Sequence, residues 1–360
     1  MLNLVRDDDV LAVTAMVRQF ALDKFGTAPG DSATRLGSAG WEAVESLGLL
    51  GATGGDDAPS ALVRTLACEQ LGYGHAGLAV AAVLRGAAER AVDAIDPTTG
   101  RRGDAPGVPA LALFEGFGRS PAETRTSLLR RDGELRLVGS KVAIADAEEA
   151  DRLVVVARDG ADGTLRLVVV PTSTPGVVLD SSLDHPGLLG VGLRSATLDV
   201  VVSTDPRPVS EGGGADAVTL AANETRVHLG AVLVGLAQRA VEYAAKYATE
   251  RVAFDRVISS FQGVSFPLAE AQIGLEAARL ALHRQAVAID RRHLLELDAG
   301  VSSAVSYAAR VATSATRDAV QTLGGHGFIN DHPVGGWYAA AATLAAVVGD
   351  PLRFRFEPRL

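Results

Sequence analysis

The chain has 360 residues, 48% of them apolar, which is enough to bury a large core and to divide into two or three domains. Its formal net charge of -9 argues against a nucleic-acid partner, and its single cysteine, Cys68, excludes an intrachain disulfide and a cysteine-based metal cluster. The first residues lack the pattern of a signal peptide, and charges interrupt the apolar runs before they reach membrane-span length. We therefore expect a cytoplasmic protein with no membrane partner.

The first hundred residues have the periodicity of helices. Apolar residues recur at helical spacing within residues 10–20, and residues 41–49 and 62–71 continue the pattern. Residues 78–95 are rich in alanine and apolar, which is typical of a buried helix. Residues 98–109 are rich in glycine, proline and charge, and are the first candidate linker.

The pattern changes to that of a sheet after Ala110. Short runs of β-branched residues at 135–139, 153–157, 165–171 and 196–202 are separated by turns rich in glycine and aspartate. This spacing predicts a small antiparallel β domain, followed by a second linker over residues 206–214.

The last third returns to long helices. Residues 217–248, 261–292 and 299–323 are each long enough to span a bundle, and Gly324-Gly325 would end the third as a left-handed cap. The expected fold is α+β, with an N-terminal helical domain (1–108), a middle antiparallel β domain (109–208) and a C-terminal four-helix bundle (209–360).

Two motifs in the last third suit a nucleotide. Residues 247–262 run Tyr-Ala-Thr-Glu-Arg-Val-Ala-Phe-Asp-Arg-Val-Ile-Ser-Ser-Phe-Gln, and residues 321–328 run Gln-Thr-Leu-Gly-Gly-His-Gly-Phe. A pyrophosphate favours a guanidinium and backbone that no Cβ obstructs, although a Gly-Gly pair after a helix is also an ordinary cap. The motifs together resemble the C-terminal domain of the acyl-CoA dehydrogenase family.

That resemblance implies a fold and a set of binding residues. The helix, sheet, helix order is the plan of the family. In the family, such residues hold the ADP half of an FAD bound mainly to a neighbouring subunit. The matching positions here are Arg251, Phe254, Gln262, Gln321, Gly324 and Gly325. Asp255 replaces the family's glycine after the phenylalanine, which adds a negative charge beside the expected pyrophosphate.

The residues that hold the flavin ring in the family are replaced. Gly139-Ser140-Lys141 keeps the family's entry into a strand and sets the register. Phe114 then stands in place of a threonine, Ala143 in place of the tryptophan that packs on the ring, and Ala145 in place of a second threonine. Alanine neither donates the lost hydrogen bond nor supplies the packing surface. We expect that this chain does not hold an isoalloxazine of its own.

The catalytic glutamate of the family is also missing. The family places it at one of two positions, which are Val348 and Thr225 here, so we assign no catalytic residue. Glu224 and Asp350 lie next to these positions. We interpret Glu224 as a solvated helix residue and Asp350 as a turn residue, and leave open whether either substitutes as base.

The histidines are scattered without the spacing of metal ligands, so no metal site is expected. His326 is interpreted as a variable turn residue, and His228, on an apolar helix, as a core or interface histidine. Neither residue is assigned a role in catalysis.

This chain lacks the family's ring-binding residues and glutamate but keeps its nucleotide turn. In this it resembles the non-catalytic subunits of heteromeric actinobacterial acyl-CoA dehydrogenases. The resemblance implies an α2β2 assembly with a homologous catalytic chain, an FAD shared with that partner, and an acyl-CoA substrate from fatty acid or steroid side-chain degradation. Two alternatives stay open. One is a self-sufficient flavoenzyme of the same fold with altered chemistry, such as an oxygenase or a natural-product tailoring enzyme. The other is a structural protein without cofactor.

Overall fold

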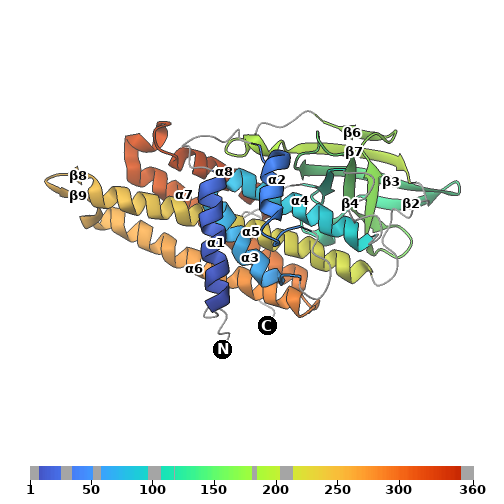
Figure 1. Ribbon diagram of the computed structural model, residues 1–360, viewed down its shortest axis with the longest axis horizontal. Helices are drawn as coiled ribbons and strands as arrows, with labels where there is room; N and C mark the ends of the chain where they lie inside the picture. Colours follow the sequence, from blue (N-terminus) through green and yellow to red (C-terminus); the bar gives the residue numbers. More distant parts are fainter. Residues whose placement is uncertain are drawn as a thin grey trace.

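The computed structural model describes residues 8–25, 35–51, 58–95, 107–116, 118–180, 185–202 and 214–349. Helices come first, a sheet follows, and long helices complete the chain (Figure 1). The two expected linkers, 98–109 and 206–214, lie almost wholly outside the described residues, so the domain boundaries at 108 and 208 stay predictions.

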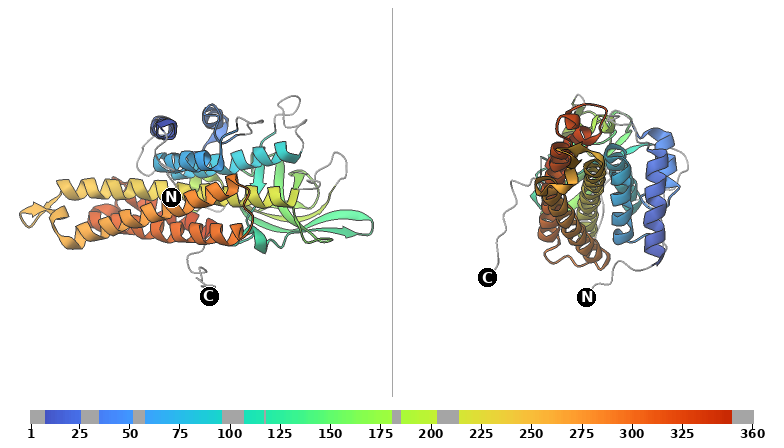
Figure 2. Two further views of the ribbon diagram at one scale, coloured as in Figure 1. Left: turned by 90° about the horizontal axis from the view of Figure 1, so that it is seen from below. Right: turned by 90° about the vertical axis from the view of Figure 1, so that its left-hand side faces the viewer.

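The N-terminal helices form two layers over the bundle. They are α1 (Asp8–Lys24), α2 (Gly37–Glu45), α3 (Ala61–Gly74) and α4 (Ala76–Ile95). Figure 2 shows α1 and α2 outside α3 and α4, which in turn lie on the C-terminal helices. The Ser60 side chain accepts a hydrogen bond from the N–H of Val63 and so caps α3, and His75 is extended and separates α3 from α4. Helix α2 ends at Glu45, earlier than predicted, because Gly48 turns the chain with a φ of 67°.

The sheet is mixed rather than purely antiparallel. Its strands are β1 (Pro109–Ala112), β2 (Ser127–Arg131), β3 (Glu134–Ile144), β4 (Arg152–Asp159), β5 (Leu165–Pro171), β6 (Val177–Leu179) and β7 (Arg194–Val201). The pairs β2–β3, β3–β7, β4–β5 and β6–β7 are antiparallel, but β1 and β2 both pair parallel with β4. Strands β1 and β2 follow one another along the same edge of β4, a long-range arrangement that local periodicity does not encode.

The C-terminal helices pack around α5 (Gly214–Glu250), which contacts the helices of both parts of the molecule. The others are α6 (Gln262–Asp290), α7 (Leu297–Leu323) and α8 (Val334–Val348). The three predicted long helices are confirmed, and α8, for which no range was predicted, is the fourth helix of the C-terminal part. A two-stranded hairpin, β8 (Val252–Ala253) and β9 (Arg256–Val257), joins α5 to α6. Among the described residues, no helix combines the length and apolarity that crossing a bilayer requires.

Two glycines allow α3 and α5 to approach closely. A Cβ built on Gly72 would lie 2.4 Å from the carbonyl oxygen of Val232, and one built on Gly235 would lie 1.9 Å from the carbonyl oxygen of Glu69. Both contacts involve backbone, which cannot move away as the end of a flexible side chain can. The N-terminal helices are therefore seated on the bundle by backbone-to-backbone packing.

We expect Gly235→Ala to destabilise the protein by about 1–3 kcal/mol, because the added methyl forces α3 away from α5. The matched control is Gly336→Ala on α8, where an added Cβ meets nothing within 4 Å. This control should be neutral or stabilising by up to about 1 kcal/mol. Urea unfolding followed by circular dichroism measures both changes, and equal stability of the two variants would contradict the close packing.

Candidate functional site

The first sequence motif forms the connection between α5 and α6. Arg251 follows the last residue of α5, and its N–H donates to the carbonyl of Tyr247 at 2.9 Å. Its own carbonyl accepts the N–H of Ile258, also at 2.9 Å. The backbone of Arg251 is thus held on both sides while its side chain is exposed. The guanidinium is available to a group outside the chain.

The tip of the β8–β9 hairpin presents an aromatic ring to solvent. Phe254 and Asp255 form its two-residue loop with φ values of 53° and 62°, the geometry that matches the twist of a hairpin. Asparagine and glycine usually occupy such positions, and a bulky residue there is strained. Phe254 is nevertheless 89% exposed, and its ring meets Phe261 edge-on with centroids 6.2 Å apart. A strained, exposed phenylalanine is typical of a binding surface.

The second motif forms an open turn at the end of α7. Gly324 caps the helix with a φ of 60°, and its N–H donates to the carbonyl of Gln321. A Cβ on Gly324 or Gly325 would meet nothing within 4 Å. Gly324 needs its positive φ, but nothing in the described chain requires a glycine at 325. Backbone left open in this way is accessible to a phosphate.

The structure brings the six expected binding residues to one end of the helical bundle. Arg251 and Phe254 follow α5, Gln262 is the first residue of α6, and Gln321 lies in the last turn of α7. The hydroxyl of Tyr247, one turn before Arg251, lies 2.8 Å from Nδ1 of His326 in the glycine turn and so joins the two motifs. Figure 1 shows the hairpin at the extremity of the molecule farthest from the sheet.

The positions expected around a flavin ring lie at the other end of α8. The N–H of Gly118, in the loop after β1, reaches the carbonyl of Val347 at 3.4 Å, which places the end of α8 beside the sheet. Helix α8 has 15 residues. Its two ends are therefore about 22 Å apart. One end adjoins the open glycine turn and the other adjoins the sheet.

Apolar side chains fill the ring positions. Phe114, Ala143 and Ala145 are at most 7% exposed and belong to the main hydrophobic core. The N–H of Val142 donates to the carbonyl of Phe114 at 2.8 Å and ties β3 to the end of β1. Phenyl and methyl groups offer no hydrogen-bond donor to the polar edge of a ring system. The chain buries these positions under its own side chains.

A buried ion pair lies next to the ring positions. Nζ of Lys141, wholly buried, lies 2.7 Å from Oε1 of Glu115 and donates to the carbonyl of Leu113 at 3.3 Å. The Glu115 carboxylate also accepts the N–H groups of Arg125 and Thr126. Burial lowers the pKa of Lys141 to about 8 in spite of the carboxylate. In the sequence, Lys141 indicates only how the strand aligns with the family's ring-binding segment. In the structure it anchors the loop after β1 to β3.

Comparison with known proteins agrees with this architecture. Residues 212–350 match the family described as acyl-CoA dehydrogenase, C-terminal domain. An acyl-CoA dehydrogenase of Bacillus subtilis is 32% identical over 230 residues, which are 62% of this chain and 60% of that protein. The chain is thus similar in sequence to acyl-CoA dehydrogenases, and its residues 212–350 match the C-terminal domain of that family.

Solved structures extend the likeness of fold over nearly the whole chain. Butyryl-CoA dehydrogenase from Megasphaera elsdenii superposes with a TM-score of 0.79 at 22% identity, over 98% of this chain and 97% of that one. A glutaryl-CoA dehydrogenase from Mycobacterium smegmatis, in complex with FADH2, superposes with a TM-score of 0.75 at 23% identity, over 95% and 91%. The described chain thus has the acyl-CoA dehydrogenase fold, although its aligned sequence spans less than two thirds of the Bacillus relative.

Both expected positions of the family's glutamate are buried and uncharged. Val348, the last residue of α8, is wholly buried. Thr225 on α5 is 1% exposed, and its hydroxyl donates to the carbonyl of Ala221 in its own helix. Asp350 lies outside the described residues. Neither described position offers a carboxylate that could accept a proton from a substrate carbon.

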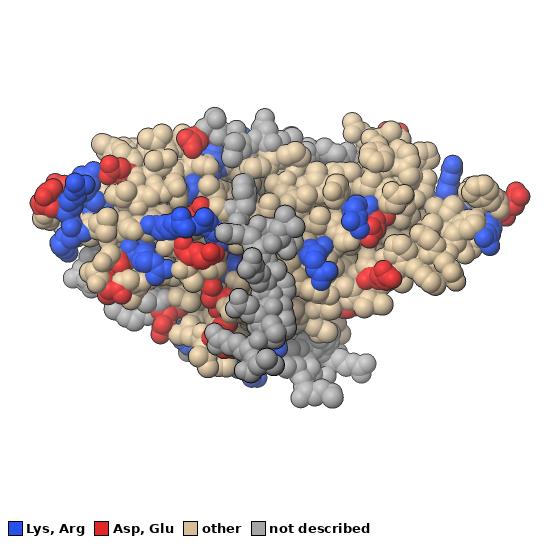
Figure 3. Space-filling model, turned by 180° about the vertical axis from the view of Figure 1, so that it is seen from behind, with Lys and Arg blue, Asp and Glu red and all other residues tan. Residues whose placement is uncertain are grey.

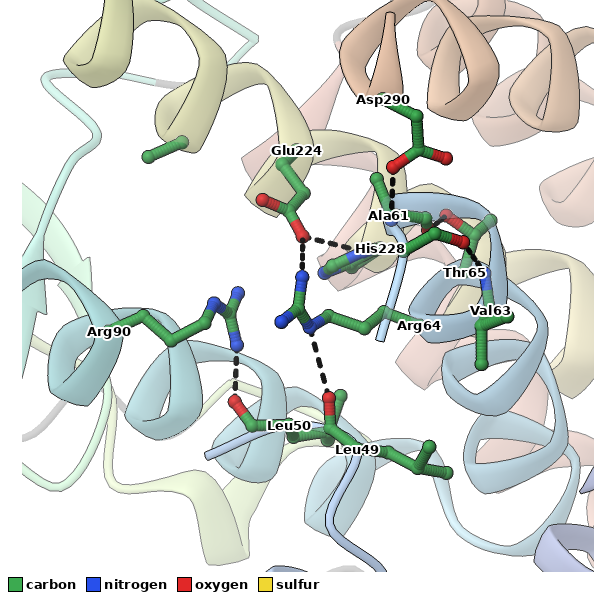
Figure 4. A network of polar contacts seen from close by, with 12 residues as sticks. Leu49, Leu50, Ala61, Val63, Arg64, Thr65, Arg90, Glu224, His228 and Asp290 are labelled. Atoms are coloured by element: carbon green, nitrogen blue, oxygen red, sulfur yellow. Dashed lines mark hydrogen bonds and ion pairs between the residues drawn. The ribbon is translucent and has the colours of Figure 1, made fainter. Parts of the chain in front are cut away.

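Glu224 is not the solvated residue that the sequence suggested. Its side chain is 13% exposed, with Oε1 3.2 Å from Nη1 of Arg64 and 3.6 Å from Nε2 of His228. Figure 4 shows this carboxylate facing Arg64, His228 and Arg90, which come from α3, α5 and α4. The prediction failed because α3 and α4 cover this face of α5, and local helical pattern cannot show what covers a helix.

Backbone carbonyl groups hold the two arginines that face Glu224. Nε of Arg64 donates to the carbonyl of Leu49 at 3.1 Å, and Nη1 of Arg90 donates to the carbonyl of Leu50. Burial opposes ionisation of Glu224, but His228, Arg90 and Arg64 outweigh it and hold its pKa below the ordinary range. A carboxylate that is already ionised and paired is a weak base. Glu224 is structural, and His228 is the core histidine that the sequence predicted.

His228 should make the stability of the protein depend on pH. Burial lowers its pKa to about 4, whereas the unfolded chain titrates near 6.5. As pH falls through this window the unfolded state binds a proton that the folded state does not, so stability present above pH 6.5 is lost towards pH 4. Between pH 7 and pH 5 we expect the wild type to lose about 2 kcal/mol more than His228→Gln.

Urea unfolding at a series of pH values measures this difference. The matched control is His293→Gln, since His293 is exposed at the end of α6. The control variant should keep the wild-type dependence on pH. Parallel stability curves for the wild type and His228→Gln would show that His228 does not carry the effect.

Proposed function

We propose that this chain is the partner subunit of a heteromeric FAD-dependent acyl-CoA dehydrogenase. A homologous catalytic chain would hold the isoalloxazine ring and supply the base for α,β-desaturation of an acyl-CoA. This chain would cover the ADP half of the FAD bound there. The assembly would be an α2β2 heterotetramer in which the chain described here contributes binding residues and no catalytic one.

One contrast within the molecule supports this proposal. The side chains that suit a nucleotide are exposed at the end of the bundle, whereas the positions that would hold the ring are filled by buried Phe114, Ala143 and Ala145. Residues at the nucleotide end therefore fit the cofactor, and residues at the ring end do not. A chain that has only the nucleotide-binding residues can bind only a cofactor whose ring is held by another chain.

The exposed residues supply the donors that an ADP group requires. Arg251 offers a guanidinium, which binds phosphate oxygens in pairs, and Gln262 and Gln321 offer amides. Gly324 and Gly325 leave backbone open to close approach. Phe254 provides an apolar surface at the rim. The negative charge of Asp255, next to Phe254, requires that the phosphates lie on the Arg251 side of the hairpin.

The surface along α6 also suits a protein partner. Phe266, Ile273 and Leu280 recur every seven residues along α6 and are 55%, 70% and 57% exposed. Repetition at this interval places them on one stripe of the helix. Seen from behind, the half of the molecule that carries the hairpin has a largely uncharged surface with charges at its tip (Figure 3). A row of exposed apolar side chains on one helix is typical of an interface.

The proposal is tested by the flavin content of the chain expressed alone and together with a homologous catalytic chain from the same genome. We expect no flavin alone and one FAD per pair of chains in the complex, measured from absorbance and protein concentration. In the complex, Arg251→Ala should weaken FAD binding about 10- to 100-fold, since it removes a charged hydrogen-bond donor.

The matched control is Arg130→Ala, which removes an exposed arginine from β2, at the end of the molecule opposite the hairpin (Figure 1). One tightly bound FAD per chain in the chain alone would overturn the proposal and favour a self-sufficient flavoenzyme, with oxygen consumption as the next measurement. A complex with no flavin, or one in which Arg251→Ala changes nothing, would favour a structural protein.

A further inference from the structure

A pair of stacked histidines lies within the nucleotide half-site. The rings of His326 and His332 are nearly parallel, with an angle of 10° between planes and centroids 5.5 Å apart. Nδ1 of His326 lies 2.8 Å from the hydroxyl of Tyr247, and Nδ1 of His332 lies 2.7 Å from the hydroxyl of Tyr243. Each imidazole is thus held through the same nitrogen by a tyrosine of α5.

The pair stands beside the residues already assigned to the half-site. Tyr243, Tyr247 and Arg251 are spaced four residues apart, so they follow one face of α5 and its end. His326 lies between Gly325 and Gly327 in the open turn and is exposed. The tyrosine-held imidazole, the arginine and the glycine backbone therefore border one surface.

The tyrosine bond determines which edge of His326 is free. When the hydroxyl of Tyr247 donates to Nδ1, the neutral imidazole carries its proton on Nε2. Nε2 takes no part in the bond to the tyrosine, and because the residue is exposed, its N–H can reach a group outside the chain. An exposed N–H donor of fixed orientation loses little freedom when it binds an acceptor, which favours recognition of an oxyanion.

The second histidine is supported from behind. The ring of Tyr243 meets Trp337 edge-on, with centroids 5.6 Å apart, and the guanidinium of Arg239 lies 5.1 Å from the centre of the Trp337 ring. Tyr247 also meets the ring of His332 edge-on at 5.8 Å. These contacts fix the position of the His332 ring. Stacking on His332 then fixes the plane of the His326 ring, and the contact with Tyr247 fixes the rotation of that ring within its plane.

We propose that His326 is a phosphate-binding residue of the half-site, oriented by Tyr247 and His332 so that its Nε2–H donates to the pyrophosphate of the dinucleotide. This inference rests on the proposed function and adds a residue to it. His326 is then more than a variable turn residue, Tyr247 is a positioning residue, and Arg251 and His326 approach the same anion from α5 and from the glycine turn.

The test uses the complex of this chain with its catalytic partner and measures the dissociation constant of FAD by fluorescence. Replacing His326 with Ala should weaken binding about 10-fold, as expected for loss of one donor to a charged group. Glutamine places an amide N–H near the position of Nε2, and asparagine places it near Nδ1. His326→Gln should therefore recover most of the affinity, and His326→Asn should not.

Two further variants separate positioning from folding. Tyr247→Phe removes only the hydroxyl, and should weaken FAD binding about 3- to 10-fold without changing the thermal unfolding midpoint of the complex. His293→Ala removes an exposed histidine far along α6 and should leave binding unchanged. Binding of FMN, which lacks the ADP half, should be the same in all four variants of His326 and Tyr247.

The outcomes separate this inference from the proposed function. A wild-type complex without FAD would refute both. FAD bound equally well by the wild type, His326→Ala and Tyr247→Phe, but weakened by Arg251→Ala, would overturn the role of His326 and leave the subunit role standing. Recovery by His326→Phe rather than by His326→Gln would show that the ring contributes stacking, and would likewise overturn the donor assignment.

Discussion

The middle of α5 is buried on all sides, and the positions of the other helices follow from this. The helix has 37 residues, and residues 225–238 are all buried. An apolar helix of this kind is stable only when other elements surround it, and α3, α4, α6, α7 and α8 do so. Because the helix is stiff, it holds Thr225 and Arg251 about 40 Å apart. The expected position of the family's base and the expected nucleotide position are separated by the same element that organises the core.

Charges beside α5 hold the N-terminal helices in place. Glu224 pairs with Arg64 of α3, and Asp290 of α6 accepts the N–H groups of Ala61 and Leu62 at the start of α3. Removing one partner of such a buried pair leaves an uncompensated charge, which is far more costly than the pair itself. A carboxylate one residue away from the base position thus has a structural role that competes with any catalytic one.

The two ends of the molecule differ in how far internal contacts explain their residues. At the nucleotide end, strain at Phe254 and open backbone at Gly325 persist without an explanation inside the described chain. At the sheet end, the side chains of Phe114, Ala143 and Ala145 are packed into the hydrophobic core. Features that internal contacts do not explain point to an external ligand or partner, whereas positions explained by packing need none. This asymmetry is the physical basis of the proposed subunit role.

Local patterns in the sequence predicted the long helices α5, α6 and α7 and four of the seven strands of the sheet, because periodicity and caps are local. The resemblance of two motifs to one family pointed to Arg251, Phe254, Gln262, Gln321, Gly324 and Gly325, but that the two motifs meet at one end of the bundle follows from how the helices pack. The parallel pairing of β1 and β2 with β4, the burial of Glu224 and the contact of His326 with Tyr247 became visible only in the folded chain. Each of these depends on contacts between residues far apart in the chain. The environment of a side chain is set by what packs against it, and a sequence pattern shows only the element that carries it.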